Sequence, residues 1–446
     1  MSAFFWTCLA VACAANAPCD LVTEKWEILD AWEIGPVWAG HPVGFFLLTV
    51  PPYQYVAFYD AERQLVVGQR KLDESHFRFK KLPTSVGWDS HNSIVMAVDK
   101  RGYLHVSGNM HVTPLIYFRM TRPHDLESLI PIHKMVGENE DRVTYPHFIT
   151  TPNGDLVFYY RDGASGRGRQ LFNVYDAESQ SWRRLLPVPL LDGGEEMSAY
   201  PSGPILGPDG MWHLCWMWRD TPDCSTNHDI SYARSRDLVH WETVDGRPLN
   251  LPITPATPGV IVDPVPIKLG LINVGHHVGF DSQRRPIVTY HKYDQAGRSQ
   301  IYNARWENDR WVIYQTSNWE YRWEFSGGGS IGAEITAGPV QIAKAGYLVQ
   351  KFSHSQYGSG TWVLDEKTLR PIDTCLHTVR LPAEIMRRES EFPGMEVRLA
   401  WDSGKPPAEE SYLLKWETLP PNRDRPRPGP LPPPSTLRLY HLRRMP

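Results

Sequence analysis

The chain has 446 residues, 41% of them hydrophobic and 22% charged, enough to bury one large core or the cores of about two to three ordinary domains. Its 17 tryptophans, 20 tyrosines and 15 phenylalanines favour β-sheet packing and surfaces on which sugar rings stack. A net charge of −4 argues against a nucleic-acid binder, whereas an acidic polysaccharide would need only a local basic pocket.

The first twenty residues, MSAFFWTCLAVACAANAPCD, contain an apolar run followed by small residues. This pattern resembles a signal peptide with a cleavage site at Ala12-Cys13-Ala14 or Ala15-Asn16-Ala17. We therefore predict a signal peptide over residues 1–17 and a secreted protein. The run is too short to span a bilayer, and no later segment approaches twenty apolar residues, so no membrane association is expected.

Cleavage there would leave four cysteines: Cys19, Cys215, Cys224 and Cys375. Four cysteines allow three pairings, of which Cys215–Cys224 joins the two that are closest in sequence.

Turn clusters followed by short β-rich runs recur along the chain, and long amphipathic helical patterns are scarce. Hairpin signals of the Asp/Asn-Gly type, or close variants, begin at Asp60, Asp99, Thr151, Gly207, Asp281 and Ala343. They recur about every 40 to 70 residues, which is the scale of four-stranded propeller blades. The segment SRDLVHW, Ser235 to Trp241, resembles the Asp-box turn of sialidase-type propellers.

Six hairpins and the unassigned ends predict an all-β, seven-bladed β-propeller over residues 18–418; a pair of β-sandwiches is the alternative. Residues 419–446 then form a tail rich in proline and arginine, LPPNRDRPRPGPLPPPST, which is typical of an extended linker. The closing TLRLYHL predicts one last strand that returns to complete the first blade, with a disordered tail as the alternative.

Four successive hairpins carry polar pairs at their open ends. Residues equidistant from a turn centre face each other with Cβ atoms about 4.5 to 5.5 Å apart. This arithmetic pairs His91 with His111, Tyr145 with Arg161, Tyr200 with Arg219, and His277 with His291. If these are the inner hairpins of adjacent blades, the pairs line one shallow pocket near the central channel; polar decoration of a wet rim is the alternative.

Histidine, tyrosine and arginine dominate this set, and carboxylates are absent from it. Glycoside hydrolysis usually needs two carboxyl groups that flank the bond. β-Elimination from a 4-linked uronic acid instead needs a base for the C5 proton, a cation for the carboxylate and an acid for the departing O4. In glucuronate the elimination is syn, so base and acid sit close together. Histidine and tyrosine suit those roles, and Arg161 can hold the carboxylate bidentately.

The motifs HNSIVMAVDKRGYLHVSGNMH, TYPHF, YYRDGASGRG and SAYPSGPILGPDG…HLCWMWRD resemble those of the BNR-repeat-containing polysaccharide lyases. That family includes ulvan lyases and the L-rhamnose-α-1,4-D-glucuronate lyase that acts on gum arabic. The resemblance covers residues 85 to 295 well and the rest loosely. It implies a seven-bladed propeller that cleaves rhamnosyl-(1→4)-glucuronate bonds by β-elimination.

The resemblance also implies roles for the paired residues. His91 and His111 match the two catalytic histidines, Tyr145 the catalytic tyrosine and Arg161 the arginine that neutralises the carboxylate. Asn92, Tyr200 and Arg219 match positions that contact substrate, and we add His277 and His291 from their hairpin. His111 or His91 is then the base and Tyr145 the acid, or the roles are exchanged. His147 and the His276-His277 pair are atypical of the family.

The chemistry needs no cofactor, although the resemblance allows a structural calcium or zinc ion. Cys215, Cys224, His213 and His228 could hold such an ion, but a disulfide or simple burial explains these cysteines equally well. We expect a monomeric enzyme with an acidic polysaccharide as its partner. Exo action on rhamnose-capped arabinogalactan is slightly preferred over endo cleavage of ulvan. The rival functions are a propeller glycoside hydrolase and a non-catalytic sugar-binding propeller.

Overall fold

The computed structural model describes residues 19, 23–343, 346–376 and 379–445. The signal peptide predicted over residues 1–17 lies outside this part of the chain. The regular secondary structure of the described residues is almost entirely β, because short runs of β-branched and aromatic residues alternate with turns throughout. Within them no helix is both long and apolar enough to cross a membrane.

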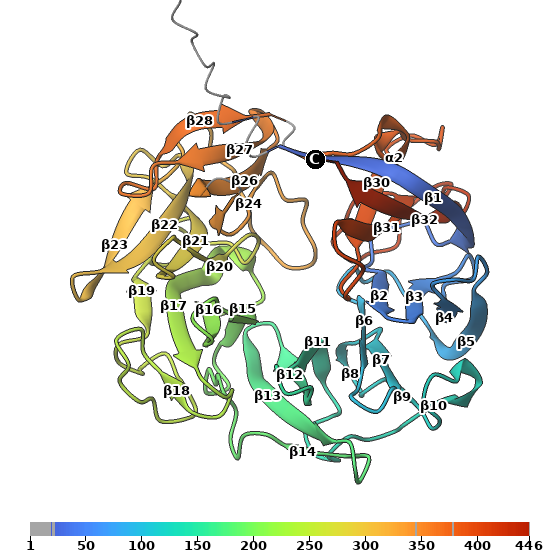
Figure 1. Cartoon of the computed structure of the whole chain (residues 1–446). Coiled ribbons are helices and arrows are strands. Elements are labelled where there is room, and N and C mark those ends of the chain that lie inside the picture. Colours follow the sequence, from blue (N-terminus) through green and yellow to red (C-terminus); the bar gives the residue numbers. More distant parts are fainter. Residues whose placement is uncertain (1–18, 20–22, 344–345, 377–378, 446) are drawn as a thin grey trace, which may run out of the picture.

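Successive sheets follow one another around a ring, and the chain runs around it once from β2 to β31 (Figure 1). The architecture is thus all-β and propeller-like, as predicted, rather than a pair of sandwiches. Six hydrogen-bonded sheets are present among the described residues. The count of seven blades stays a prediction, which depends on how the largest sheet is divided.

The first two sheets after the N-terminal strand are four-stranded antiparallel meanders. The strands of the first are β2 Phe46–Val50, β3 Tyr53–Tyr59, β4 Gln64–Lys71 and β5 Arg78–Ser85. Those of the second are β6 Ile94–Val98, β7 Leu104–Gly108, β9 Tyr117–Met120 and β10 Leu129–Pro131, with the 3-10 turn η1 at Leu126–Ser128.

The largest sheet has ten strands and consists of two halves joined by a single parallel pair, Gly168 with Ser198. The first half holds β8 His111–Thr113, β11 Val143–Thr150, β12 Leu156–Ala164, β13 Arg167–Asp176 and β14 Ser181–Arg184. The second half holds β15 Ser198–Leu206, β16 Trp212–Arg219, β17 Asn227–Ser235, β18 Trp241–Glu242 and β19 Ile261–Asp263, with the 3-10 turn η2 at Cys224–Thr226.

Two further sheets complete the run before the ring closes. One comprises β20 His277–Phe280, β21 Pro286–Tyr293, β22 Ser299–Glu307 and β23 Arg310–Gln315. The other comprises β24 Ile335–Ala337, β25 Gln341–Ile342, β26 Leu348–His354, β27 Gly358–Leu364 and β28 Pro371–Cys375.

The ring closes through a sheet that contains both ends of the described chain. Its order is β29-β1-β32-β31-β30, with the helix α2 at Ala383–Met386 nearby. These strands are β1 Glu24–Val37, β29 Val379–Arg380, β30 Glu396–Trp401, β31 Glu410–Thr418 and β32 Ser435–Arg444. The TLRLYHL segment lies in β32, between β1 and β31, so this sheet includes residues beyond 418.

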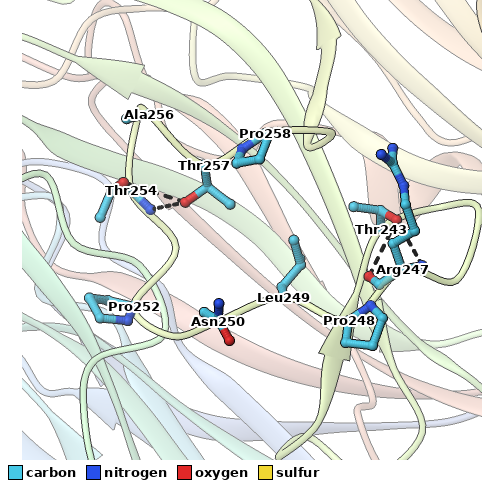
Figure 2. A pocket seen from close by; sticks show the side chains of 10 residues that line it. All are labelled: Thr243, Arg247, Pro248, Leu249, Asn250, Pro252, Thr254, Ala256, Thr257 and Pro258. Atoms are coloured by element: carbon cyan, nitrogen blue, oxygen red, sulfur yellow. Dashed lines mark hydrogen bonds between the residues drawn. The ribbon is translucent and has the colours of Figure 1, made fainter.

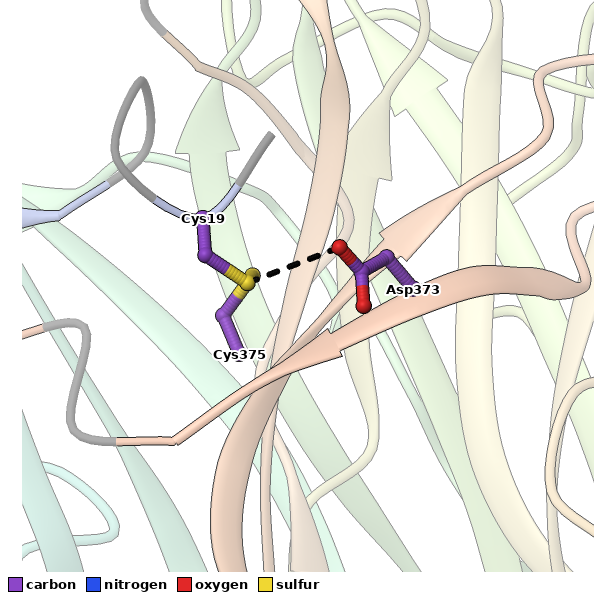
Figure 3. A group of neighbouring side chains, drawn as sticks. All are labelled: Cys19, Asp373 and Cys375. Atoms are coloured by element: carbon purple, nitrogen blue, oxygen red, sulfur yellow. Dashed lines mark hydrogen bonds between the residues drawn. A yellow bond between two sulfur atoms is a disulfide. The ribbon is translucent and has the colours of Figure 1, made fainter. Parts of the chain in front are cut away.

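A disulfide adds a covalent link at the same closure. Cys19 bonds Cys375 of β28 (Figure 3), whereas Cys215 and Cys224 are free thiols buried in the protein. Cys215 and Cys224 belong to different hydrophobic clusters, so proximity in sequence did not bring them together. Asp373 lies 3.6 Å from the Cys19 sulfur, but a disulfide sulfur has no hydrogen to donate and is no longer a thiolate metal ligand.

The Asp-box resemblance corresponds to a real turn between β17 and β18. Asp237 accepts hydrogen bonds from the backbone amides of Val239 and His240, and the Trp241 side chain is buried beside it. The aspartate closes the turn and the tryptophan anchors it in the core, which explains this spacing of polar and aromatic residues.

Candidate functional site

His91 and His111 meet in space, with ring centroids 4.2 Å apart. The β6–β7 ladder pairs Ile94 with Gly108, the register that turn arithmetic predicts, but it ends there. His91 lies in the turn before β6, and His111 starts β8, which leaves this sheet and pairs with Thr144 of β11. The two rings therefore stand where two neighbouring sheets adjoin.

Asp89 holds both histidines. One carboxylate oxygen lies 2.6 Å from Nδ1 of His91, and the other lies 2.5 Å from Nδ1 of His111. A carboxylate only accepts hydrogen bonds, so each Nδ1 carries the hydrogen and each Nε2 is left for other partners. Burial alone would raise the pKa of Asp89, but the hydrogen bonds and charges of His111 and His91 hold it well below its usual range.

A β-bulge carries Tyr145 toward this pair. The β11–β12 ladder is interrupted between Thr144 and His147, and Tyr145 adopts a left-handed φ of 52°. Its ring centroid lies 5.7 Å from that of His91 and 6.1 Å from that of His111. Because of the bulge, Arg161 pairs with Thr144 rather than with Tyr145 as predicted. Burial raises the pKa of Tyr145 well above its usual value, against the opposing charge of Arg161.

Arg161 is a buried cation whose two terminal nitrogens have no hydrogen-bond partner among the described residues. Its side chain is 3% exposed, and only Nε is bonded, to the carbonyl of Gly163 at 3.3 Å. The guanidinium carbon lies 4.9 Å from the ring centre of Tyr145. A side chain at Gly168 would lie 2.7 Å from Arg161 Cδ, so glycine there makes room for the arginine.

Tyr200 and Arg219 also meet, although not as the cross-strand pair that was predicted. The ladder pairs Tyr200 with Met217, two residues from the predicted register. Both side chains nevertheless face one side of the sheet, and Arg219 Nη1 donates to the Tyr200 hydroxyl at 3.1 Å. Burial raises the pKa of Tyr200, but Arg161 and Arg219 outweigh it and bring the pKa below its usual value.

A cavity of about 250 Å³ opens beside these groups. It is lined by Tyr145, His147, Tyr159, Arg161, Gln170, Ala199, Tyr200, Pro201, Asn273 and His276. His91 and His111 adjoin the cavity through Tyr145. The arrangement offers proton carriers on one side of a small hollow and an unpaired cation in its wall.

A larger hollow, of about 450 Å³, lies within the segment between β18 and β19 and contains none of the predicted site residues. Two pairs of its polar residues bond each other, Thr243 with Arg247 and Thr254 with Thr257, as Figure 2 shows. It has neither buried unpaired charge nor aromatic rings, so we place the candidate site at the smaller cavity.

Three predicted residues neither line the cavity nor bond or stack on a predicted residue that lines it. His277 pairs with Thr289 instead of His291, which places that register two residues from the prediction. His291 is 1% exposed and bonds the carbonyl of Gly270 among aromatic rings, and burial lowers its pKa to about 4, so its role is structural. Asn92 is buried and its backbone carbonyl accepts a hydrogen bond from Tyr59.

Sequence reasoning missed Asp89 and most of the cavity wall. Asp89 stands two residues before His91 in the motif WDSHN, and this Asx-turn spacing was an available signal. His276 bonds the backbone carbonyl of Tyr200, and His147 stacks on Tyr159 with centroids 4.8 Å apart. These wall residues come from separate strands and loops, so only the fold brings them together.

The predicted metal ligands do not assemble. His213 bonds Tyr232 and Asp209, and His228 is paired with Asp220 and Asp229. Among the described residues, Asp89, His91 and His111 form the one group outside the disulfide region with three ligand atoms close together. Their 2.5 and 2.6 Å contacts have the length of charge-assisted hydrogen bonds, which occupy the Nδ1 atoms and leave the Nε2 atoms as the possible histidine ligands.

The sequence is similar to a known protein family and to several ulvan lyases. Residues 53–319 match the model of the BNR repeat-containing family. An ulvan lyase, short isoform, of Alteromonas sp. (strain LOR) is 31% identical over 131 residues, which are 26% of this chain and 24% of that protein. An ulvan lyase, long isoform, of Pseudoalteromonas sp. (strain PLSV) is 48% identical over 53 residues, 11% of this chain and 5% of that protein. The chain thus matches about a quarter or less of the length of these relatives.

Solved structures of similar fold cover nearly the whole chain. The polysaccharide lyase Uly1 aligns with a TM-score of 0.62 over 94% of this chain and 99% of its own, at 12% identity. A PL25 ulvan lyase bound to -[GlcA(1-4)Rha3S]- aligns with a TM-score of 0.60 over 92% of this chain and 95% of its own, at 13% identity. At such identities the likeness concerns the fold, while the family model covers more than half of the sequence. The chain belongs to the BNR repeat-containing family.

Proposed function

We propose that this protein is a polysaccharide lyase that cleaves a 4-linked glucuronate by syn β-elimination and leaves an unsaturated uronate. The observation that carries the proposal is Arg161, a buried guanidinium with two unpaired nitrogens in the cavity wall. An unpaired buried charge is costly, so such a site is built for an anionic partner. A uronate carboxylate fits both nitrogens at once.

The neighbouring groups supply the proton transfers. Asp89 accepts Nδ1–H from both histidines, so Nε2 of His111 or His91 is the atom that takes the C5 proton. Tyr145 keeps its proton because burial raises its pKa, so it acts as the acid at O4. Their ring centroids are 6.1 Å apart or less, which suits an elimination in which base and acid work on the same side of the sugar. Side chains alone perform these steps, so no cofactor is required.

The substrate we propose contains the rhamnosyl-(1→4)-glucuronate bond. That bond is common to ulvan and to rhamnose-capped arabinogalactan. Cleavage of ulvan would be endo action, and removal of the terminal rhamnose of arabinogalactan would be exo action. The small volume of the cavity, about 250 Å³, supports the exo preference, whereas the similarity to ulvan lyases supports ulvan.

The disulfide supports secretion. Dividing the ten-stranded sheet at its single parallel pair supports seven blades. A monomeric state and a structural calcium or zinc ion stay predictions.

The rival functions make different demands on the site. A glycoside hydrolase needs two carboxyl groups about the bond, but no aspartate or glutamate lines the described cavity, and Asp89 is already bound to two histidines. A non-catalytic sugar-binding propeller would use the same cavity without turnover. Only a measurement of product separates it from the lyase.

Ultraviolet absorbance during incubation with ulvan and, separately, with gum arabic tests the proposal. Elimination creates a conjugated uronate that absorbs, so we expect a rise with at least one polymer. His111→Ala and Tyr145→Phe should reduce the rate by about 10²- to 10⁴-fold, the range for loss of an acid or base. New reducing ends without absorbance would mean a hydrolase, and binding without either product would mean a binding module.

A further inference from the structure

The segment between β31 and β32 reaches back to the candidate site. At its tip Arg423 and Asp424 adopt left-handed φ values of 53° and 58°. The Arg423 guanidinium donates to the carbonyls of Ser326 and Gly328, and its backbone amide donates to the carbonyl of Ser330. This tip is therefore anchored on the loop between β23 and β24.

Asp424 links this tip to the histidine pair. Its carboxylate accepts the backbone amide of Ser90 at 3.0 Å with one oxygen and that of Ser330 at 2.7 Å with the other. The second oxygen also lies 3.5 Å from Nδ1 of His91. The side chain is 12% exposed, so the carboxylate is largely shielded from water and its contacts are not loose surface pairs.

The turn that carries His91 is held from two sides as a result. Asp89 fixes the His91 ring from within the turn, and Asp424 fixes the backbone of Ser90 from outside it. No hydrogen-bonded strand restrains these residues, because the β6–β7 ladder ends at Ile94. Displacing a catalytic group by about 1 Å can lower the rate of an enzyme by about 10²-fold. A restraint on the turn from outside would therefore affect the rate of the proposed reaction.

We propose that Asp424 is a positioning residue of the active site, through which the C-terminal segment holds the turn that presents His91. The charged and titratable groups around that ring are Asp89, Asp424, His111 and Tyr145. Asp424 does not face the cavity, so it acts through His91. The kinetic part of this inference rests on the proposed lyase function; the structural part does not.

Three substitutions separate the contributions of Asp424. Asp424→Ala removes both the amide acceptor and the charge, and should lower kcat by about 10²-fold with little change in KM. Asp424→Asn keeps one acceptor oxygen and loses the charge, so an intermediate loss is expected. Asp424→Glu restores the carboxylate and should recover part of the rate. Asp176→Asn is the matched control, since Asp176 also accepts two backbone amides, from Glu178 and Ser179, on an exposed turn.

A second readout is independent of turnover. Nitrogen-15 spectra of the histidine rings, with His91 assigned from a His91→Asn variant, should show a changed His91 environment in Asp424→Ala. Hydrogen exchange at the amides of Ser90 and Ser330 should speed up in the same variant. Unchanged ring signals and exchange would overturn the proposal whether or not the wild type is a lyase. Changed signals with unaltered kcat in an active enzyme would equally overturn the positioning role.

Discussion

At the scale of single residues, Asp89 decides which nitrogen of each histidine is left for the proposed substrate. It accepts Nδ1–H from both rings, as the aspartate of a catalytic triad does for one. An amide in its place can accept from one ring and must offer N–H to the other, which then presents the wrong tautomer. Asp89, His91 and His111 thus form one unit of three side chains.

Asp89→Asn should accordingly lower kcat by up to about 10⁴-fold while the protein stays folded, the loss seen when a triad aspartate is replaced by asparagine. Steady-state kinetics with circular dichroism checks this expectation. Asp209→Asn is a matched control, because Asp209 pairs with His213 away from the cavity, at 2.9 Å. A fully active Asp89→Asn enzyme would show that the carboxylate does not orient the bases.

Arg161 is the residue that would hold the carboxylate of the proposed substrate. Arg161→Lys keeps a charge but loses the planar fork, so it cannot hold a carboxylate through two parallel hydrogen bonds. We expect kcat/KM to fall by about 10²-fold or more, corresponding to roughly 3 kcal/mol for a charge-assisted contact. Arg101→Lys, on a partly exposed arginine that contacts Ala177 and Glu178, provides the control. Equal losses in both variants would remove the case for a specific carboxylate site.

At the scale of elements, the Asp-box turn between β17 and β18 has a pH-dependent stability. Partial burial opposes ionisation of Asp237, but hydrogen bonds from His240 and Val239 hold its pKa at about 2, below the usual 3.8. A lowered carboxyl pKa stabilises the folded state above the unfolded-state pKa, and that contribution disappears as the pH falls through the folded-state value. It is therefore complete above pH 3.8 and lost toward about pH 2.

Urea unfolding of the wild type and of Asp237→Asn measures this window. The difference in unfolding free energy should be constant above about pH 4 and should shrink as the pH falls toward about 2. The effect is small because half of the Asp237 side chain meets solvent, which screens its interactions. A difference that grows on acidification would contradict the assignment of these hydrogen bonds.

The disulfide is the element that ties the two ends of the ring together. Cys19 and Cys375 are separated by 356 residues, and β1 pairs with β29 just beyond them. Constraining so long a loop in the unfolded chain is worth about 2–5 kcal/mol. Cys375→Ser should thus melt at a lower temperature than the wild type, and reductant should lower the wild type to the same midpoint. A variant that melts like the oxidised wild type would show that the sheet alone closes the ring.

At the scale of the whole molecule, local signals in the sequence predicted the fold well and the site in part. The arithmetic of turn centres predicted the β6–β7 register, which no bulge interrupts, and it predicted that His91 and His111 meet, although the ladder ends before either histidine. It missed by one residue at Tyr145, where the ladder is interrupted, and by two at His277. At Tyr145 a bulge changes the register without a strong sequence signature, so counting alone could not find it. At His277 the ladder is uninterrupted, and the turn is centred on Gln283 rather than on Arg284.

The residues that the sequence did not predict are brought together by turns and by contacts between distant parts of the chain. Asp89 was overlooked because it reaches the histidines through a turn and not across a ladder. Asp424 could not have been found, since ring closure is what brings residue 424 beside residue 90. The Cys19–Cys375 pair depends on the same closure, whereas sequence proximity favoured Cys215 with Cys224. Residues that meet only when the sheet ring closes leave no periodic pattern in the chain.

In the proposed reaction the cavity beside Arg161 breaks a glycosidic bond without water. Mass spectrometry of the products formed in oxygen-18-labelled water tests it directly. Elimination should give an unsaturated uronate at the new non-reducing end and, when products are analysed before exchange at the reducing end, no label gained through cleavage. A saturated product that carries one labelled oxygen per cleavage would contradict the account and identify hydrolysis instead.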